Sequence, residues 1–417
     1  MTEPTPGRAV MPRLAMVMTS LYVAIGGVVA VLLPAQIERI DPQGKVAALS
    51  AATSIAFAVT LFSQPLLGAA SDRARRRLGS RAGWMLASAL VGSVAVALMG
   101  WTGTIVAVCV VWAAAQFALN GVDITASAAV VDEFPRGRRG RPSGALAASV
   151  AVGTAIGAVI AGSLASRVEL GFALVAAIAL VGAVAFVGVR RPARSAPRRG
   201  TLRRPVESVD SDSRGGREAG GRGVRRSPGG DFAWALGARF AFTFGQQAVS
   251  TYLLYILDDH VRVPEGEAPL YVGALTATGL VGLIVTAAIS GWWSDRSGRR
   301  RVLLVVSSVI FAAALLLPIV APVLPVMFAY AFLQGVALGM HLAVAGALIS
   351  EVLPGGDRRP GRDLGLANTA INGAQALAPL AAGGIVVVSG GYQALFASAI
   401  LAALLSAALA WRVRSIG

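Results

Sequence analysis

Apolar residues dominate the chain in long runs, and short polar segments separate one run from the next. Twelve of these runs are long enough to cross a membrane, since a spanning helix needs about 20 mostly apolar residues. We therefore predict an all-α integral membrane protein with twelve transmembrane helices, at about 14–34, 46–70, 83–101, 104–131, 144–166, 170–189, 232–257, 269–293, 302–320, 323–350, 365–388 and 392–412.

The composition agrees with a polytopic membrane protein and disagrees with a water-soluble one. Of the 417 residues, 55% are hydrophobic and only 14% are charged, whereas a soluble protein has about 25% charged residues. The single cysteine, Cys109, excludes an internal disulfide and lies in an apolar run, which favours a small buried side chain.

The net charge of +16 first suggests a nucleic-acid partner, but the positions of the charges indicate membrane topology instead. Twelve spans place both termini on one side, and that side carries 32 of the 37 basic residues. The opposite side carries four: Arg39, Lys45, Arg167 and Arg262. The positive-inside rule therefore places both termini in the cytoplasm. We expect the lipid bilayer and a small-molecule substrate as partners, no nucleic acid, and a monomer.

One segment, 190–230, divides the chain into two parts. It is rich in Arg, Gly, Ser and Pro and has almost no large apolar residues, so it lacks the material for a core of its own. We interpret it as a cytoplasmic linker between a six-helix bundle over 1–189 and a second six-helix bundle over 231–417.

A short charged tag occurs once in each half. Residues 68–81 read GAASDRARRRLGSR and residues 291–301 read GWWSDRSGRRR, so both contain glycine, Ser-Asp-Arg and an arginine cluster. A second repeat aligns Gly144 with Gly365, and the small residues that follow, up to Gly162 and Gly383, also align. The repetition predicts two pseudo-symmetric halves in the same orientation with a binding site between them.

The tag resembles the loop signature G-x-x-x-D-R-x-G-R-R/K of the major facilitator superfamily. The second copy matches at Gly291, Asp295, Arg296 and Arg299, and the first copy matches at Gly68, Asp72 and Arg73. The first copy is longer and is similar to the form found in the sugar–cation symporter and sucrose-transporter branches. The resemblance implies the superfamily fold, secondary active transport by alternating access, and a multi-pass position in the bacterial plasma membrane.

The tags are predicted to gate the cytoplasmic side. Asp72, at the end of its helix, is expected to face the positive N-terminal end of the helix that begins near Gly365, and Asp295 the helix near Gly144. Such a charge–dipole contact is worth roughly 0.3–1 kcal/mol and would stabilise a cytoplasm-closed state. The alternative is that the arginines only fix topology. The predicted gate residues are Gly68, Asp72, Arg73, Arg77, Asp132, Gly291, Asp295, Arg296, Arg299 and Glu351.

Three ionisable residues lie inside predicted spans, where such groups are costly and indicate function. They are Asp123, Arg239 and His341, on helices 4, 7 and 10, which the superfamily resemblance places around a central cavity. Each lies about 7–9 residues from the cytoplasmic end of its span, so we expect all three at one depth. Gln116, Asn120 and Asp123 have i, i+4, i+7 spacing and therefore share one helical face, and Asn368, Asn372 and Gln375 have the same spacing on helix 11. Polar neighbours and one aromatic complete the predicted cavity: Gln116, Asn120, Gln246, Gln247, Asn368, Asn372 and Tyr22.

Asp123 is the candidate for proton coupling, since a carboxyl group at membrane depth can load and release a proton as its surroundings change. It would pair with Arg239 in alternation with the substrate. A purely structural pair with Arg239 is the alternative, and the long Arg239 side chain could also extend to the cytoplasm. His341 fits a ligand role and a structural role equally well.

Two signals conflict about cargo and direction. The elongated first tag favours a sugar-like solute, whereas the glycine spacing of the fifth helix resembles the antiporter signature of drug exporters and also suits close packing. We predict a secondary active transporter of a small polar organic solute with the proton as coupling ion, and export of a drug or secondary metabolite is the alternative. A lipid flippase or membrane enzyme is a second alternative, but the sequence has no hydrolase, phosphate-loop or metal motif, so we expect neither catalysis nor a cofactor or metal.

Overall fold

The structure is a computed structural model, and it describes residues 10–78, 80–134, 140–188, 229–351 and 360–413. Every regular element in these ranges is a helix, as predicted. Eleven of the described helices are long and apolar enough to cross a membrane. The predicted linker lies outside the described residues except for its last two, which begin a helix.

The N-terminal half contains six membrane-crossing units, and the first of them changes its helix type along its length. Its elements are α1 (Val10–Gly27), η1 (Val28–Leu32), α2 (Leu33–Ile40), α3 (Lys45–Leu78), α4 (Ala82–Met99), α5 (Ile105–Glu133), α6 (Gly140–Ser163), η3 (Ala165–Arg167) and α7 (Val168–Gly188).

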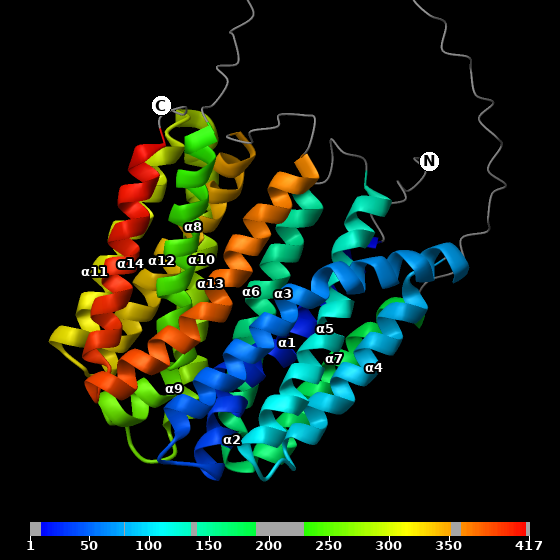
Figure 1. The fold of residues 1–417 in the computed structure, drawn as a ribbon, viewed down its shortest axis with the longest axis horizontal. Helices are drawn as coiled ribbons and strands as arrows, with labels where there is room; N and C mark the ends of the chain where they lie inside the picture. The colour runs from blue at the N-terminus through cyan, green and yellow to red at the C-terminus, as the bar shows by residue number, and fades with distance from the viewer. Residues whose placement is uncertain (1–9, 79, 135–139, 189–228, 352–359, 414–417) are drawn as a thin grey trace, which may run out of the picture.

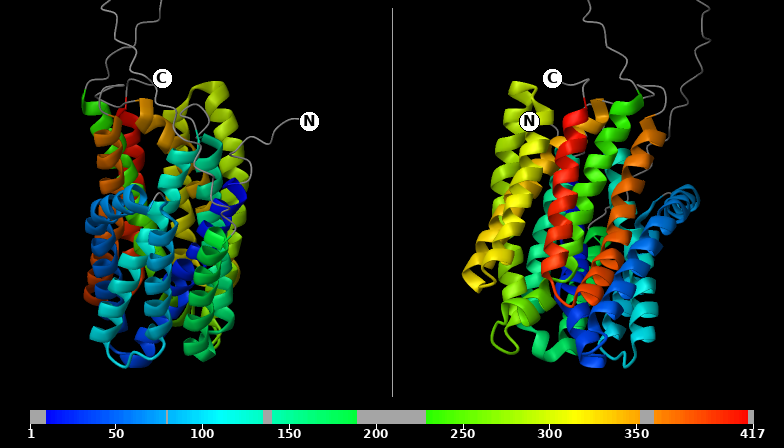
Figure 2. Two further views of the ribbon diagram at one scale, coloured as in Figure 1. Left: turned by 90° about the vertical axis from the view of Figure 1, so that its right-hand side faces the viewer. Right: turned by 60° about the vertical axis from the view of Figure 1, so that its left-hand side comes forward.

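The C-terminal half repeats this arrangement. Its elements are α8 (Gly229–Thr251), α9 (Leu253–Tyr255), η4 (Ile256–Val261), α10 (Ala268–Ser297), α11 (Arg300–Val320), α12 (Leu324–Glu351), α13 (Pro360–Ser389) and α14 (Gln393–Arg412). The unit made of α8, α9 and η4 is less apolar because it carries Arg239, Gln246 and Gln247, but it packs in the bundle against α13 and α14. The beginning of α1 and the end of α14 lie on the same side of the bundle (Figures 1 and 2), as predicted for twelve spans.

The pseudo-symmetry extends to an irregularity in the first helix of each half. Residues 28–32 and 256–261 both form π-helical turns near the extracellular end. Such turns are uncommon and cluster at functional sites. In the N-terminal half Pro34 lies two residues after this turn, and its missing N–H cannot continue the regular hydrogen-bond ladder.

The helices run further into the tags than the sequence indicated. We expected Asp72 to end its helix, but α3 continues to Leu78, so the extra length of the first tag is additional helix. Arginine favours helix, and a basic last turn complements the negative end of the helix dipole. In the second tag α10 ends at Ser297 because Gly298 adopts a left-handed conformation, with φ of 68°.

The two halves meet through α3 with α13 and through α6 with α10. Figure 1 shows α3 and α13 together near their extracellular ends and diverging toward the side of the chain termini. A Cβ atom added at Gly68 or Gly291, at the cytoplasmic ends of α3 and α10, would meet open space. The structure is therefore an inward-facing conformation, closed on the extracellular side.

Candidate functional site: a central cavity between two gates

A cavity of about 670 Å³ lies between the two halves. Eight of the twelve membrane-crossing units contribute side chains to its wall, and these units come in equal numbers from both halves. Of the predicted cavity residues, the wall includes Tyr22, Gln116, Asn120, Asp123, Gln246, Gln247 and Asn372. The side chain of the remaining amide, Asn368, lies outside the described residues.

The acidic part of the cavity belongs to the N-terminal half. The hydroxyl of Tyr22 on α1 donates a hydrogen bond to Oδ2 of Asp123 on α5 over 3.4 Å. One turn away, the Asn120 amide donates to Thr60 Oγ1 over 2.9 Å and to the Gln116 backbone carbonyl over 2.7 Å. The predicted shared face of Gln116, Asn120 and Asp123 thus points into the cavity. Asp123 is the only carboxylate among the described lining residues, and no arginine, lysine or histidine accompanies it.

The C-terminal half supplies mostly amides and hydroxyls. Gln246 donates to Ser250 Oγ over 3.0 Å, and Gln247 donates to Thr251 over 3.1 Å, so both amides are oriented by their own helix. Two lining amides that we did not predict, Gln64 on α3 and Gln334 on α12, belong to a set of eight in the cavity wall. Each is a single amide in an apolar run, and this polarity at membrane depth was the signal that the sequence offered.

Arg239 and His341 do not line this cavity in the described part of the chain. The His341 ring stacks on Phe242 with 3.8 Å between centroids, and its Nδ1 lies 3.3 Å from Ser307 Oγ. The hydrogen-bond partner of Asp123 is Tyr22 rather than Arg239. An Asp123–Arg239 pair is therefore absent from this inward-facing conformation, and His341 is packed into the interior of the C-terminal half.

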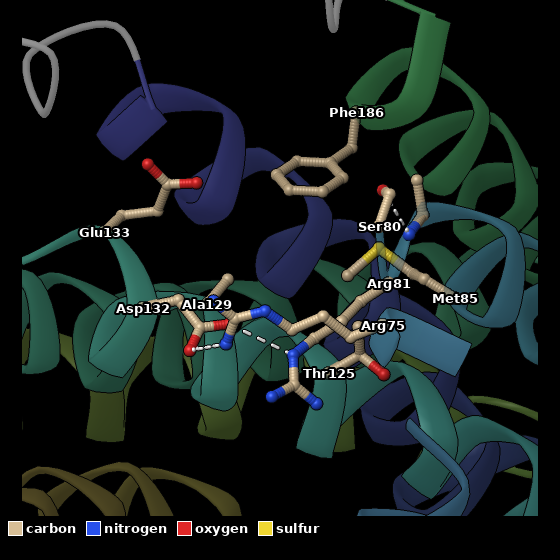
Figure 3. A pocket seen from close by; sticks show the side chains of 10 residues that line it. Arg75, Ser80, Arg81, Met85, Thr125, Ala129, Asp132, Glu133 and Phe186 are labelled. Atoms are coloured by element: carbon tan, nitrogen blue, oxygen red, sulfur yellow. Dashed lines mark hydrogen bonds and ion pairs between the residues drawn. The ribbon is translucent and has the colours of Figure 1, made fainter. Parts of the chain in front are cut away.

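At the cytoplasmic surface the first tag forms an ion-pair cluster within the N-terminal half (Figure 3). Arg81 pairs with Asp72 over 2.6 Å and with Asp132 over 3.1 Å, and Arg75 also pairs with Asp132. Arg81 was not among the predicted gate residues, although its basic type in the tag was the available signal. Arg73, Arg77, Arg296 and Arg299 are exposed here, and the side chains of Asp295 and Glu351 lie outside the described residues. The predicted contacts across the halves belong to the cytoplasm-closed state and stay a prediction.

The extracellular side is closed by polar contacts between the halves. Lys45, the only lysine of the chain, forms ion pairs with Glu38 over 2.7 Å and with Asp259 of the other half over 2.9 Å. The Tyr255 hydroxyl donates to the Pro34 carbonyl over 2.9 Å. Nearer the cavity, the Pro379 carbonyl accepts hydrogen bonds from Ser50 at 3.1 Å and Tyr252 at 2.9 Å.

Comparison with known proteins identifies the family. The family model described as Major Facilitator Superfamily matches residues 15–266 and 235–416. The chain belongs to the major facilitator superfamily. It is thus a multi-pass membrane protein with the fold of secondary transporters, and the superfamily prediction from the two tags is confirmed. The sugar–cation branch stays a prediction.

Solved structures of other superfamily members share this fold. A bacterial homologue of the human lysosomal transporter Spinster, in an inward-facing and unoccupied conformation, has a TM-score of 0.69 and 17% identity, covering 99% of this chain and 98% of its own. A point mutant of the nucleoside transporter NupG has a TM-score of 0.70 and 11% identity, covering 97% of this chain and 98% of its own. No curated protein sequence matches the chain.

In this superfamily member the glycines of α6 serve two different contacts. Gly153 and Gly157 face α1, and a Cβ atom at Gly153 would lie 2.9 Å from Tyr22 Cβ. Gly162 instead faces the backbone carbonyl of Pro269 on α10, in the other half. Its repeat partner Gly383 on α13 makes the matching approach to Ser50 on α3. The aligned glycines thus occupy the two pseudo-symmetric interfaces that close the extracellular side.

Lys45→Gln is predicted to shift the transporter toward its outward-open state. Only the Lys45–Asp259 pair joins the two halves. Exposed ion pairs contribute about 1 kcal/mol or less, so we expect the loss of this pair to change the ratio of the two states by up to about fivefold. The measurement is the rate at which a membrane-impermeant maleimide, added outside, labels Val29→Cys in the cavity wall of a Cys109→Ala background.

Arg39→Gln is the matched control for this experiment. Arg39 pairs with Glu169 over 3.0 Å on the same side of the membrane, but both residues belong to the N-terminal half. We expect no change in labelling rate with this variant. Equal acceleration by both substitutions would mean that surface charge, rather than the contact between the halves, controls the labelling rate.

Extracellular acidification is predicted to favour the inward-facing state through Asp258. Burial raises the pKa of Asp258 to about 6. The neighbouring Glu38 and Asp259 carboxylates add to this increase, and the Lys45 ammonium opposes it. When the extracellular side opens, water reaches Asp258 and its pKa falls toward about 3.9. The closed state then binds more protons, so it gains stability as the pH falls from about 6 toward 4 and loses this advantage above 6.

The same maleimide assay tests this pH effect. Labelling of Val29→Cys, corrected for the intrinsic pH dependence of thiol reactivity with a small thiol, is expected to slow as the external pH falls from 7 to 5. Asp258→Asn should remove that pH dependence. A variant with an unaltered pH profile would assign the titration to another group.

Proposed function

We propose that the chain carries a small polar organic solute, such as a sugar, across the bacterial cytoplasmic membrane together with a proton. The observation that supports this best is the cavity wall, which combines eight amide side chains with one carboxylate, Asp123. Amides both donate and accept hydrogen bonds, which suits hydroxyl groups of a solute. A solute carboxylate or phosphate would meet no cationic side chain among the described lining residues.

The two functions of the cavity are assigned to different halves. Asp123 and Tyr22 in the N-terminal half are proposed to exchange the proton, whereas Gln246, Gln334 and Asn372 in the C-terminal half are proposed to orient the solute. With the proton site and the solute site on different walls, the charge of Asp123 would influence solute binding through the electrostatic field in the cavity, without direct contact. Because helices of one chain enclose the whole cavity, we propose that the monomer is the transporting unit.

Export of an amphipathic cation is the second candidate. Leucines of α10 and α12, including Leu275, Leu280 and Leu338, give the cavity an apolar wall in addition to the acidic one. A cation with an apolar body would pair with Asp123 and compete with the proton, which gives antiport rather than symport.

Flux into proteoliposomes under an imposed pH gradient tests both candidates. Radiolabelled sugars, nucleosides (chosen because NupG is a nucleoside transporter) and cationic drugs are each measured with the gradient in both directions, with and without a protonophore. We expect gradient-dependent accumulation of a neutral hydroxylated solute in the direction of proton flow. Movement of a cation against the proton flow would favour the export candidate. No flux of any class in either direction would contradict secondary transport of these solutes.

A further inference from the structure

Arginine–tryptophan pairs gather at the cytoplasmic edge of the C-terminal half. The guanidinium carbon of Arg301 lies 4.1 Å from the ring centroid of Trp411, and that of Arg412 lies 5.1 Å from the ring centroid of Trp234. These four residues come from the beginnings of α8 and α11 and from the last turn of α14. We call this set of four the cytoplasmic corner.

Buried packing fixes the cytoplasmic corner in place. The apolar side chains beneath it form a separate core cluster of the surrounding helices, which includes Phe232, Leu303 and Ala410. In addition, Nη1 of Arg301 donates a hydrogen bond to the Val413 backbone carbonyl over 3.4 Å. Both guanidinium groups are thus held by stacking on tryptophan, and that of Arg301 is also held by a hydrogen bond to the backbone. Their positions are therefore preorganised for binding.

The cytoplasmic corner lies at the depth of lipid headgroups. The apolar span of α11 begins at Arg300 and that of α14 ends at Arg412, so Arg301 and Arg412 are at the limit of the hydrocarbon region. Tryptophan is enriched at this depth, and Trp411 is 56% exposed on the bundle surface. Two turns before Trp411 on the same face, Leu404 is also exposed and continues the surface into the acyl-chain region.

The corner has positive charge without an ion-pair partner in the part of the chain that the structure describes. None of the ion pairs there includes Arg301 or Arg412. Asp231, in the first turn of α8, is buried at 6% exposure and presents little of its carboxylate to the surface on which a headgroup would lie. A phosphate can therefore approach both guanidinium groups without strong repulsion from this acid.

We infer that the cytoplasmic corner binds the phosphate headgroup of an anionic phospholipid from the inner leaflet. Arginine presents a planar fork that matches phosphate oxygens, and it stacks on aromatic rings at the same time. The inner-leaflet surface is negatively charged, and each basic residue near it strengthens lipid attraction. The headgroup would lie against Arg301 and Arg412, with one acyl chain along Trp411 and Leu404.

Lipid retention by the purified full-length protein tests the inference. The protein is incubated in detergent with equal amounts of phosphatidylglycerol and phosphatidylcholine, and bound lipid is counted by native mass spectrometry. We expect the wild type to retain phosphatidylglycerol preferentially. Arg301→Gln with Arg412→Gln should lower this retention by about fivefold for each arginine removed and leave phosphatidylcholine unchanged.

Arg76→Gln with Arg77→Gln is the matched control, because it removes the same charge from exposed arginines on the cytoplasmic side of α3. The control should retain phosphatidylglycerol as the wild type does, and an equal loss in both double variants would overturn the inference. If the corner variant unfolds, the single Arg412→Gln variant, whose side chain is exposed, replaces it. Displacement of the lipid by millimolar inorganic phosphate would assign the corner to a free anion instead and would also overturn the inference.

Discussion

Asp123→Asn is expected to abolish accumulation of solute against its gradient, while exchange of solute across the membrane persists. Asp123 is the only carboxylate in the described cavity wall, and the Tyr22 hydroxyl is its hydrogen-bond partner. Asparagine keeps the size and the acceptor oxygen of the side chain but cannot take up a proton. The carrier could then still bind solute and change conformation, but no proton movement would be linked to that change.

The size of this effect follows from the driving force. With one proton per solute, a gradient of one pH unit supports about tenfold accumulation, because one unit corresponds to about 1.4 kcal/mol. The variant should reach a ratio of inside to outside concentration near one. The readout is uptake of labelled solute into proteoliposomes, once with an acidic exterior and once with unlabelled solute inside and no gradient.

Two further variants make the Asp123 experiment specific. Glu169→Gln removes a carboxylate that is exposed and distant from the cavity, so accumulation should be as in the wild type. Tyr22→Phe keeps the aromatic ring but removes the hydrogen bond to Asp123, so the pH at which accumulation is half-maximal should change while transport continues. Full accumulation by Asp123→Asn would remove this residue as the coupling site.

Gly383→Leu is expected to hold the extracellular side open and to stop transport. A Cβ atom at Gly383 would lie 2.7 Å from both Cβ and Oγ of Ser50 in the other half, which is too close for a real contact. Helices α3 and α13 approach each other closely at this point, so a larger side chain can be accommodated only if the halves separate. Overpacking costs about 1–3 kcal/mol, which changes the ratio of outward-open to inward-facing molecules by roughly 5- to 150-fold.

Gly384→Leu provides a control from the adjacent residue. A Cβ atom at Gly384 would meet nothing within 4 Å in the described part of the chain, so the larger side chain is free to face outward. Spin labels on the turns at 41–44 and 390–392, in a Cys109→Ala background, measure the separation of the halves. We expect longer distances for Gly383→Leu and unchanged distances for Gly384→Leu. Identical distance distributions for the two variants would mean that the α3–α13 contact does not control closure.

Much of the cavity could be predicted from the sequence because polar groups at membrane depth are costly and therefore conspicuous. Asp123, Asn120 and Gln116 were identified by their spacing on one helical face, and this face does point into the cavity. The same reasoning placed Arg239 at the same level of the cavity, where the structure does not place it. Spacing along one helix gives relative positions of side chains, but the rotation of that helix against its neighbours is not encoded locally.

The contacts that close the extracellular side were not predictable in the same way. In the sequence Lys45 was only one of the four basic residues assigned to the extracellular side, and its partner Asp259 is distant in sequence. Gly162 and Gly383 were recognised as equivalent positions, but small residues occur wherever membrane helices pack closely. Only the assembled helices show that these two face the opposite half whereas Gly153 and Gly157 face their own.

The sequence by itself determined the all-helical membrane fold, the orientation, the internal repeat and the family, because each depends on run length, charge position or local motif. Tertiary structure decided which polar side chains share the cavity and which helices touch across the halves. The physical reason is that apolar residues in a membrane face lipid and protein interior alike, so hydropathy does not fix how a helix is rotated. The tertiary structure also decided which state is adopted, the inward-facing one, in which the ion pairs of the first tag stay within one half.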